Sequence, residues 1–436
     1  MCWIALSPPE DHATAWCWHA LQFTPRVAVE QGCVLLDVSA TLRLWGGLRA
    51  LLLRLLQPEG LPACLGWARA GTAPMAQALL QLKLAGQPRP GQVPDGLPLD
   101  TLAAARPALA VLERTGCRSW GQLRALPRAG VARRFGAALL EALDQAYGER
   151  PVAYAWCRLP PVFDQNAELP AAATAAPELL WTGQRLLAAL HAWLRAGQRG
   201  VLAMELQWTH DLRRLDGRSL ARQGLLTVRT AQPTQDMGHL RRLLAEHLER
   251  TPLAAPANHL RLRTLQTAAF APLSTSLLPE ERQRGERLHE LVERLGARLG
   301  ADRVLVPQLV ADHRPECMQR WVPAQEAKEA REAREAAAPP VEALAPDAAL
   351  YPAWLLHEPL PLAMEGGQPV FHGPLQLLAR PRRVDGPGWW DLSAPKPAVR
   401  DHRLALSAQL GLLWLYCERP HSGQPDPRWF LQGVYA

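Results

Sequence analysis

One stretch of this chain cannot join a hydrophobic core, and it limits the possible folds more than any other feature. Residues 324–349 are rich in Ala, Glu, Arg and Pro, and a solvated helix ending before Pro339 is the most regular structure they allow. Such a composition offers no apolar face to a core, so we predict a linker. The whole chain of 436 residues also exceeds what a single core usually holds, and we expect two to four domains.

Composition narrows the class of protein. The formal net charge is +7, carried mostly by Arg, whose planar fork suits phosphate contacts, and this favours an anionic partner. A coding bias that raises Arg throughout explains any single Arg equally well. The eight cysteines form no C-x-x-C pair, so no metal site of that kind is indicated. No signal peptide is predicted and the longest apolar runs contain Arg, so we expect a cytoplasmic protein without a membrane partner.

The first 95 residues alternate strand-like and helix-like runs. The strand-like runs cover residues 2–6, 23–30, 33–38 and 64–68, and the helix-like runs cover 15–21, 48–56 and 72–84. Prolines and glycines crowd between Gly86 and Pro98 and predict a boundary. From Leu99 to Gly148 the pattern is helical, in short pieces.

A second α+β segment opens near Pro160. Its expected helices cover residues 180–195 and 236–249, and its expected strands cover 203–208, 225–230 and 259–265. Beyond Tyr351 the chain has short β-like runs. Several tryptophans occur there, either as the core of a small module or as a partner surface: Trp354, Trp389, Trp390, Trp414 and Trp429.

Three groups of motifs carry a resemblance to a known family. The run from Val34 to Gly47, V-L-L-D-V-S-A-T-L-R-L-W-G-G, resembles the palm motif A-Y-L-D-V-T-x-S-x-R-L-F-G of Y-family translesion DNA polymerases. Residues 112–116, 120–127 and 133–136 resemble the helix-hairpin-helix thumb of that family. Residues 310–316 and 429–436 are similar to one subgroup, the ImuB-type proteins of bacterial mutagenesis cassettes.

The resemblance implies an α+β multidomain fold. In chain order we expect a truncated palm-like domain without fingers (1–95), a helix-hairpin-helix thumb-like domain (96–158) and a little-finger-like DNA-binding domain (159–272). A connecting segment (273–323), a linker (324–349) and a β-rich C-terminal partner-binding module (350–436) follow.

The residues that would hold metal ions are missing. Nucleotidyl transfer needs two divalent cations held by converging carboxylates. When Asp37 is aligned with the last Asp of the palm motif, Gly32 and Cys33 occupy the expected Asp-Glu positions, and neither is a hard oxygen ligand. The first strand has no carboxylate before Glu10. A substitute pair of Glu30 and Asp37 would fall on opposite strand faces by its odd offset, although the turn between them weakens this argument. We expect no catalytic residue, no metal and no cofactor.

DNA contacts are expected in two places. Glycine-containing hairpins can direct backbone amides at phosphates, and the thumb-like candidates are Gly116, Gly121, Gly130, Arg118, Arg133 and Arg134. The second group lies at alternating strand positions of the little-finger-like domain: Arg222, Arg229, Arg261 and Arg263. A helical packing module and a solvated sheet face are the competing interpretations.

A clamp-binding peptide is expected in the connecting segment. Residues 274–279, S-T-S-L-L-P, fall where ImuB-type proteins carry a Q-L-x-L-F peptide. Leu277 and Leu278 would fill the apolar pocket of the sliding clamp, although the leading Gln and the aromatic anchor are absent.

The resemblance implies a noncatalytic factor of error-prone translesion synthesis in the bacterial DNA damage response. Its partners would be primer-template DNA, the sliding clamp, an error-prone replicative-type polymerase alpha subunit and a RecA-like accessory protein. Two alternatives remain: a low-activity Y-family polymerase with rearranged ligands, and a general DNA-binding assembly protein unrelated to lesion bypass.

Overall fold

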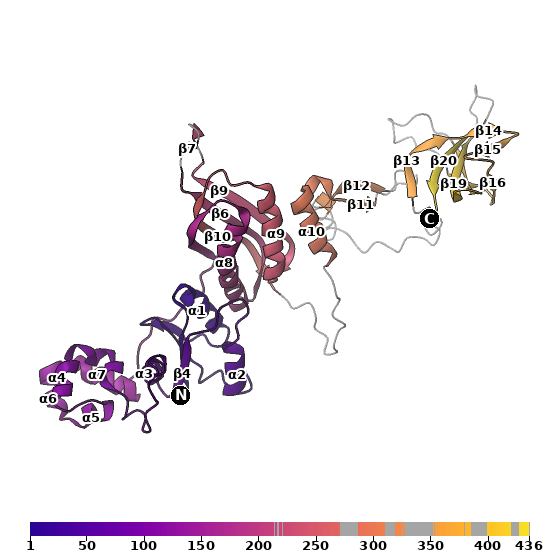
Figure 1. The fold of residues 1–436 in the computed structure, drawn as a ribbon. Helices are drawn as coiled ribbons and strands as arrows, with labels where there is room; N and C mark the ends of the chain where they lie inside the picture. The colour runs from indigo at the N-terminus through magenta and orange to yellow at the C-terminus, as the bar shows by residue number, and fades with distance from the viewer. Residues whose placement is uncertain are drawn as a thin grey trace. The chain divides into compact units, whose positions relative to one another are not determined.

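The computed structural model of the chain divides into two compact units, Met1–Arg298 and Leu299–Ala436, coloured along the chain in Figure 1. The residues that the structure describes are 1–212, 214–215, 218–219, 221–270, 287–309, 319–324, 326–327, 352, 354–378, 380–384, 399–419 and 427–435.

The first unit begins with a four-stranded antiparallel sheet. Its strands are β1 (Trp3–Ser7), β2 (Val27–Glu30), β3 (Cys33–Asp37) and β4 (Gly66–Ala70), in the order β2-β3-β1-β4. Around it lie a 3-10 turn η1 (Glu10–His12) and the helices α1 (Ala13–Leu21), α2 (Leu48–Leu55) and α3 (Ala73–Leu84). The strands and helices predicted for this segment are confirmed, with ends shifted by a few residues.

Both faces of this sheet are covered by helices. Ile4 and Leu36 share a core with residues of α1 and α2. Because successive strand side chains point to opposite faces, Ala5, Cys33 and Leu35 face the other way, and they pack against α3. α1 ends at Leu21 and β2 begins at Val27, so only five residues separate the two elements.

A helical cluster follows α3, as the sequence predicts. It consists of η2 (Leu99–Thr101), η3 (Ala103–Ala108), α4 (Leu109–Arg114), α5 (Trp120–Ala125), α6 (Arg128–Phe135) and α7 (Ala137–Tyr147). Its core is centred on Leu97, Leu112, Trp120 and Leu143 and includes Leu79 of α3. The cluster is therefore packed onto the first sheet through α3 and does not hang from a flexible tether.

A second four-stranded antiparallel sheet completes the first unit. Its strands are β5 (Asp164–Ala173), β6 (Arg199–His210), β9 (Gln223–Thr234) and β10 (Ala257–Ala269), in the order β5-β10-β6-β9. α8 (Ala176–Ala196) and α9 (Met237–Arg250) share its core, and β7 (Arg214–Leu215) pairs with β8 (Arg218–Ser219). The three predicted strands and two predicted helices are confirmed, while β5 is an additional strand.

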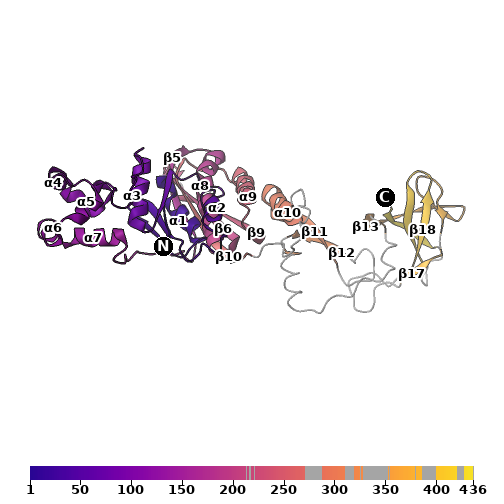
Figure 2. The same ribbon diagram turned by 90° about the horizontal axis from the view of Figure 1, so that it is seen from below.

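The two sheets are joined by a common core. α1 packs against α8, and Figure 2 shows the two helices next to each other. Phe163 lies between them, with ring centroids 5.6 Å from Trp18 and 6.1 Å from Trp193. Arg185 of α8 also donates to Asp11 at 2.8 Å. Burial of this much apolar surface holds the two sheets together as one unit.

The segment expected to be a connection contains regular structure. It includes α10 (Leu288–Leu299), the 3-10 turn η4 (Ala301–Arg303) and a hairpin of β11 (Leu305–Leu309) with β12 (Gln319–Pro323). The expected linker, residues 324–349, lies almost wholly outside the described residues.

The C-terminal part is rich in β-structure, as predicted. Its strands are β13 (Trp354–Pro361), β14 (Ala363–Glu365), β15 (Gln368–Val370), β16 (Gln376–Leu377), β17 (Arg382–Val384), β18 (Arg400–Ser407), β19 (Gly411–Glu418) and β20 (Arg428–Val434). The main sheet has the order β13-β20-β19-β18-β16, with β17 also paired to β18. Trp414 is buried in this sheet, whereas Trp354 is exposed, and Trp389 and Trp390 lie outside the described residues.

Within the described part of the chain, no helix has the length and apolar character needed to cross a membrane.

The shared core predicts a large cost for removing its central ring. Phe163→Ala should lower the free energy of unfolding by about 3–5 kcal/mol, because it leaves a cavity between α1 and α8. Chemical denaturation followed by circular dichroism measures this. Trp181→Ala removes an exposed ring from α8 and serves as the control. Equal effects of the two substitutions would contradict a common core.

Candidate nucleic-acid interface

The positions expected to hold metal ions are part of a tight turn and a packed core. Gln31 and Gly32 connect β2 to β3 with φ values of 51° and 75°, and a type I′ hairpin turn requires positive φ at both central residues. Cys33 is buried and packs with Ala73, Ala76 and Leu80. Burial raises the pKa of the Cys33 thiol. A buried neutral thiol beside a glycine cannot act as a pair of magnesium ligands.

Asp37, the one carboxylate of the palm-like motif, has a structural role. Its carboxylate accepts from the Ser39 amide at 3.0 Å and from Arg26 Nη1 at 3.1 Å. Burial alone would raise the pKa of Asp37, but these hydrogen bonds outweigh it and hold the pKa below the ordinary value. The side chain therefore fixes the turn after β3.

Glu30 and Asp37 do not form a substitute site, although the argument from their spacing was wrong. Glu30 is paired with Cys33 across the hairpin, and cross-strand partners share a face of the sheet. Cys33 and Asp37 are four residues apart on one strand, so Glu30 and Asp37 also share that face. They lie at opposite ends of β3, about 13 Å apart at the usual rise per residue. The two carboxylates are therefore kept apart by the length of the strand and not by pointing to opposite faces of the sheet.

An aromatic cluster lies on the same face as Cys33. Trp3 contacts Tyr154 and Trp156, with ring centroids at 5.3 Å and 6.3 Å. The segment that carries the last two rings is fixed to β2, because the Cys157 amide donates to the Val27 carbonyl at 2.7 Å. Burial, with a contribution from Glu30, raises the pKa of Tyr154 to about 12. Among the described residues no three His, Cys, Asp or Glu side chains are grouped to hold a metal ion.

In the first hairpin of the helical cluster, around Gly116, the backbone amides donate hydrogen bonds to groups of the protein itself. The Gly116 amide donates to the Glu113 carbonyl at 3.0 Å, and the Arg118 amide donates to Gln122 at 2.7 Å. The Gly121 amide donates to the Asp95 carbonyl at 2.9 Å, and a Cβ at Gly121 would lie 2.7 Å from Asp95. Gly121 is thus needed for close packing of α5. The Arg118 side chain of this hairpin is exposed, as are those of Glu113 and Arg114.

The second hairpin is more open. Gly136, with φ of 90°, connects α6 directly to α7. The first amides of a helix have no partner within the helix, and Ala137 and Ala138 are exposed. Arg133 and Arg134 lie in the last turn of α6 and are also exposed. Gly130 lies inside α6 instead of at a turn, and the sequence prediction missed Gly136 as the hairpin residue.

Ion pairs separate the arginines of the cluster into two groups. Arg128 donates to both oxygens of Asp144 at 2.9 and 2.7 Å, and Arg124 pairs with Glu149 at 2.5 Å. None of the ion pairs formed by the described residues involves Arg118, Arg133 or Arg134. These three side chains retain their charge for an external anion.

The exposed face of the second sheet has balanced charge. Arg229, Arg261 and Arg263 are exposed on it, and Arg222 lies just before β9. Asp164 and Glu205 are the cross-strand partners of Arg263, so acidic and basic side chains share this face. Arg261 donates to both oxygens of Asp164 at 2.7 and 2.5 Å and thereby holds the pKa of Asp164 below its usual range. A phosphate would have to compete with Asp164 for Arg261.

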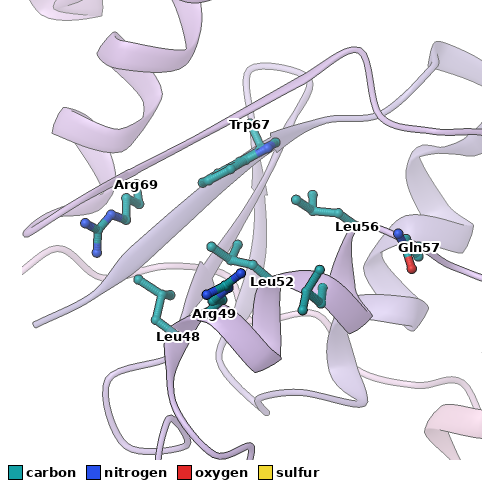
Figure 3. A pocket seen from close by; sticks show the side chains of 8 residues that line it. Leu48, Arg49, Leu52, Leu56, Gln57, Trp67 and Arg69 are labelled. Carbon is teal, nitrogen blue, oxygen red and sulfur yellow. The ribbon is translucent and has the colours of Figure 1, made fainter.

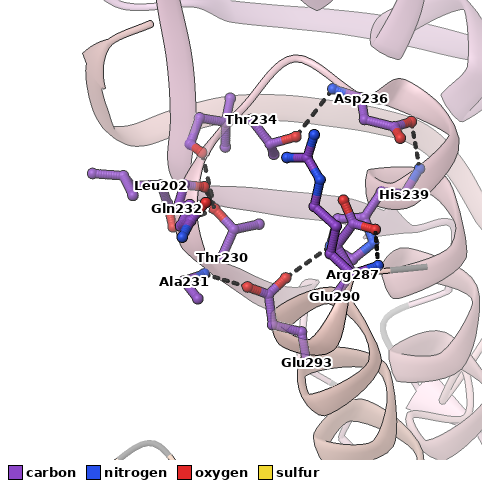
Figure 4. Close-up of polar contacts among 11 residues, drawn as sticks. Leu202, Thr230, Ala231, Gln232, Thr234, Asp236, His239, Arg287, Glu290 and Glu293 are labelled. Atoms are coloured by element: carbon purple, nitrogen blue, oxygen red, sulfur yellow. Dashed lines mark hydrogen bonds and ion pairs between the residues drawn. The ribbon is translucent and has the colours of Figure 1, made fainter. Parts of the chain in front are cut away.

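The expected clamp-binding residues Leu277 and Leu278 lie outside the described residues, but both flanks of their segment are fixed. The Phe270 amide donates to the Gln198 carbonyl at 3.0 Å. On the other side, α10 is held by Glu293, which accepts from the Ala231 amide and lies 2.7 Å from His239 Nε2, as Figure 4 shows. Both flanks are thus attached to the second sheet and its helices.

Comparison with known proteins identifies relatives over nearly the whole chain. Protein ImuB from two strains of Caulobacter vibrioides is 29% identical over 466 aligned positions, which cover 98% of this chain and 94% of that protein. The chain is therefore similar to ImuB over nearly its whole length, and the resemblance inferred from its motifs is confirmed. No family model matches the chain.

Solved polymerase structures are also similar to part of the chain. A Dbh ternary complex is 12% identical, covering 58% of this chain and 77% of that chain, with a TM-score of 0.25. DinB from Sulfolobus solfataricus is 11% identical, covering 60% and 79%, with a TM-score of 0.26. A DinB family error-prone DNA polymerase from the same organism is 10% identical, with the same coverage and a TM-score of 0.27.

The apolar packing around Cys33 predicts that a carboxylate is not tolerated at residue 33. Cys33→Glu should lower the free energy of unfolding by more than about 2 kcal/mol, because it buries a charge or a protonated acid among apolar side chains. Cys33→Ala should cost about 1 kcal/mol. Urea denaturation of both variants measures the difference. A Cys33→Glu protein as stable as the wild type would contradict the assigned packing.

The pKa of Asp37 predicts how its contribution to stability depends on pH. The folded-state pKa lies below the unfolded value, so the contribution is present above about pH 3.9 and is lost as the pH falls through the folded pKa. Asp37→Asn should therefore destabilise the protein by about 1–2 kcal/mol at neutral pH, and the difference should shrink in acid. Urea denaturation from pH 7 to pH 3 tests this; a difference that is constant over that range would rule it out.

Proposed function

We propose that this chain is a noncatalytic accessory factor of error-prone translesion DNA synthesis in the bacterial DNA damage response. Similarity to ImuB and the palm-like motif support a role in translesion synthesis. The observation that carries the noncatalytic part is the pair Gly32 and Cys33, one in a left-handed turn and the other in an apolar core.

Nucleotidyl transfer at the end of the palm-like sheet would lack the two metal ions that neutralise the charge of the triphosphate. Two metal ions must be held within a few ångströms of the triphosphate and the attacking hydroxyl. Here Asp37 is engaged by Arg26 and Ser39, and Glu30 lies at the other end of β3. Supplying the missing ligands would require a new turn and a new core.

DNA binding is the activity that the remaining surface supports. The hairpin around Gly136 combines exposed helix amides with Arg133 and Arg134, and the first hairpin adds Arg118. Such contacts recognise the backbone and not the base sequence, which suits a factor that must act at any lesion. Arg229 of the second sheet and Arg222 just before β9 would add contacts. Arg261 and Arg263 would do so after exchanging Asp164 for a phosphate.

Partner recruitment is the other half of the proposal. Leu277 and Leu278, between β10 and α10, would contact the sliding clamp. The C-terminal module would bind the error-prone replicative-type polymerase alpha subunit and the RecA-like accessory protein, with the exposed Trp354 as one contact.

The DNA-binding part of the proposal makes a quantitative prediction. Arg133→Ala with Arg134→Ala should weaken binding to all DNA sequences alike and lower the salt slope by about two, because two phosphate contacts are lost. Fluorescence anisotropy at several salt concentrations measures this. Arg89→Ala with Arg106→Ala makes the same change of net charge at exposed positions outside the hairpins. Equal losses for both pairs would reject the hairpin as the contact site.

A further inference from the structure

An apolar groove lies on the first sheet, away from the hairpins. It is formed between α2 and β4 and has a volume of about 570 Å³, within the range of ligand-binding pockets. Figure 3 shows the ring of Trp67 facing α2 across this groove. The apolar side chains that line it are Leu48, Leu52, Leu53, Leu56 and Trp67.

Packing within the first unit leaves this groove open to solvent. β4 is the last strand of its sheet, so no described strand pairs with its outer edge. Leu53, which lines the groove, is 57% exposed. An exposed apolar groove beside a free strand edge is typical of a protein-binding surface.

The charges around the groove have one sign. Arg49 and Arg69 line it, and no acidic side chain does. Lys83 lies 5.2 Å from the centroid of the Trp67 ring. No ion pair within the described part of the chain involves any of these three cations. An apolar floor with an uncompensated basic rim is complementary to an acidic, amphipathic ligand.

We propose that this groove binds an acidic, amphipathic peptide segment of a partner protein. Two or three apolar side chains of the peptide occupy the space between Trp67 and α2, and its carboxylates pair with Arg49 and Arg69. DNA fits the basic rim but not the leucine-lined floor, because a phosphate backbone gains nothing from apolar side chains. The site uses none of the residues proposed for DNA binding and stands independently of that function.

The test uses the full chain and a displayed library of random peptides of about twelve residues. Selected peptides are labelled with fluorescein, and their affinity is measured by anisotropy. Leu53→Asp and Arg49→Glu should each weaken binding by about tenfold or more. Leu44→Asp and Arg43→Glu make the same changes at exposed residues that do not line the groove, and they should leave binding unchanged. The selected sequences should combine acidic and apolar residues.

Three outcomes would overturn the proposal. The library could yield no peptide that distinguishes the groove variants from the wild type. The selected peptides could lack acidic residues. Labelled single-stranded or duplex DNA could lose affinity with Arg49→Glu while every selected peptide is unaffected, in which case the basic rim belongs to a DNA-binding surface.

Discussion

The packing of α3 against β1 and β3 holds the first sheet and the helical cluster together. Ala5, Cys33 and Leu35 pack with Ala73, Ala76 and Leu80 from α3. The same helix, through Leu79, also joins the core of the helical cluster. Around Cys33, where converging carboxylates would be needed for metal binding, the sheet face is therefore packed with apolar side chains, and the same helix also positions the hairpins proposed to contact DNA. A charged ligand set on this face would weaken the contact that holds the helical cluster in place.

The contact between α1 and α8 holds the two sheets of the first unit together. α1 packs on α8, and the Trp18, Phe163 and Trp193 rings join the cores of the two sheets. The proposed DNA-binding surfaces, on the helical cluster and on the second sheet, thus belong to one compact unit. A scaffold that holds DNA and recruits an enzyme needs such fixed geometry more than it needs a closing active site.

Much of this fold could be predicted because its elements have strong local patterns. The apolar run of β3 and the periodicity of α8 indicate their structures directly. β5 could not be predicted, since D-Q-N-A-E-L-P-A-A-A is poor in β-branched and aromatic residues and becomes a strand through pairing with β10. The ion pair of Arg261 with Asp164 joins residues far apart in the sequence, so no local pattern shows that this arginine is already engaged. Glu30 and Asp37 were expected on opposite faces of the sheet but share one. The alternation of side chains holds along a single strand and does not continue across a hairpin turn.

We propose that this protein holds DNA without extending it. The most direct measurement follows primer-template binding and primer extension on one purified sample with magnesium and nucleotides. We expect binding that weakens steeply with salt and no extension above a mock purification. Extension that disappears in an Asp37→Ala variant would contradict this proposal and would mean that a metal site forms at the end of β3.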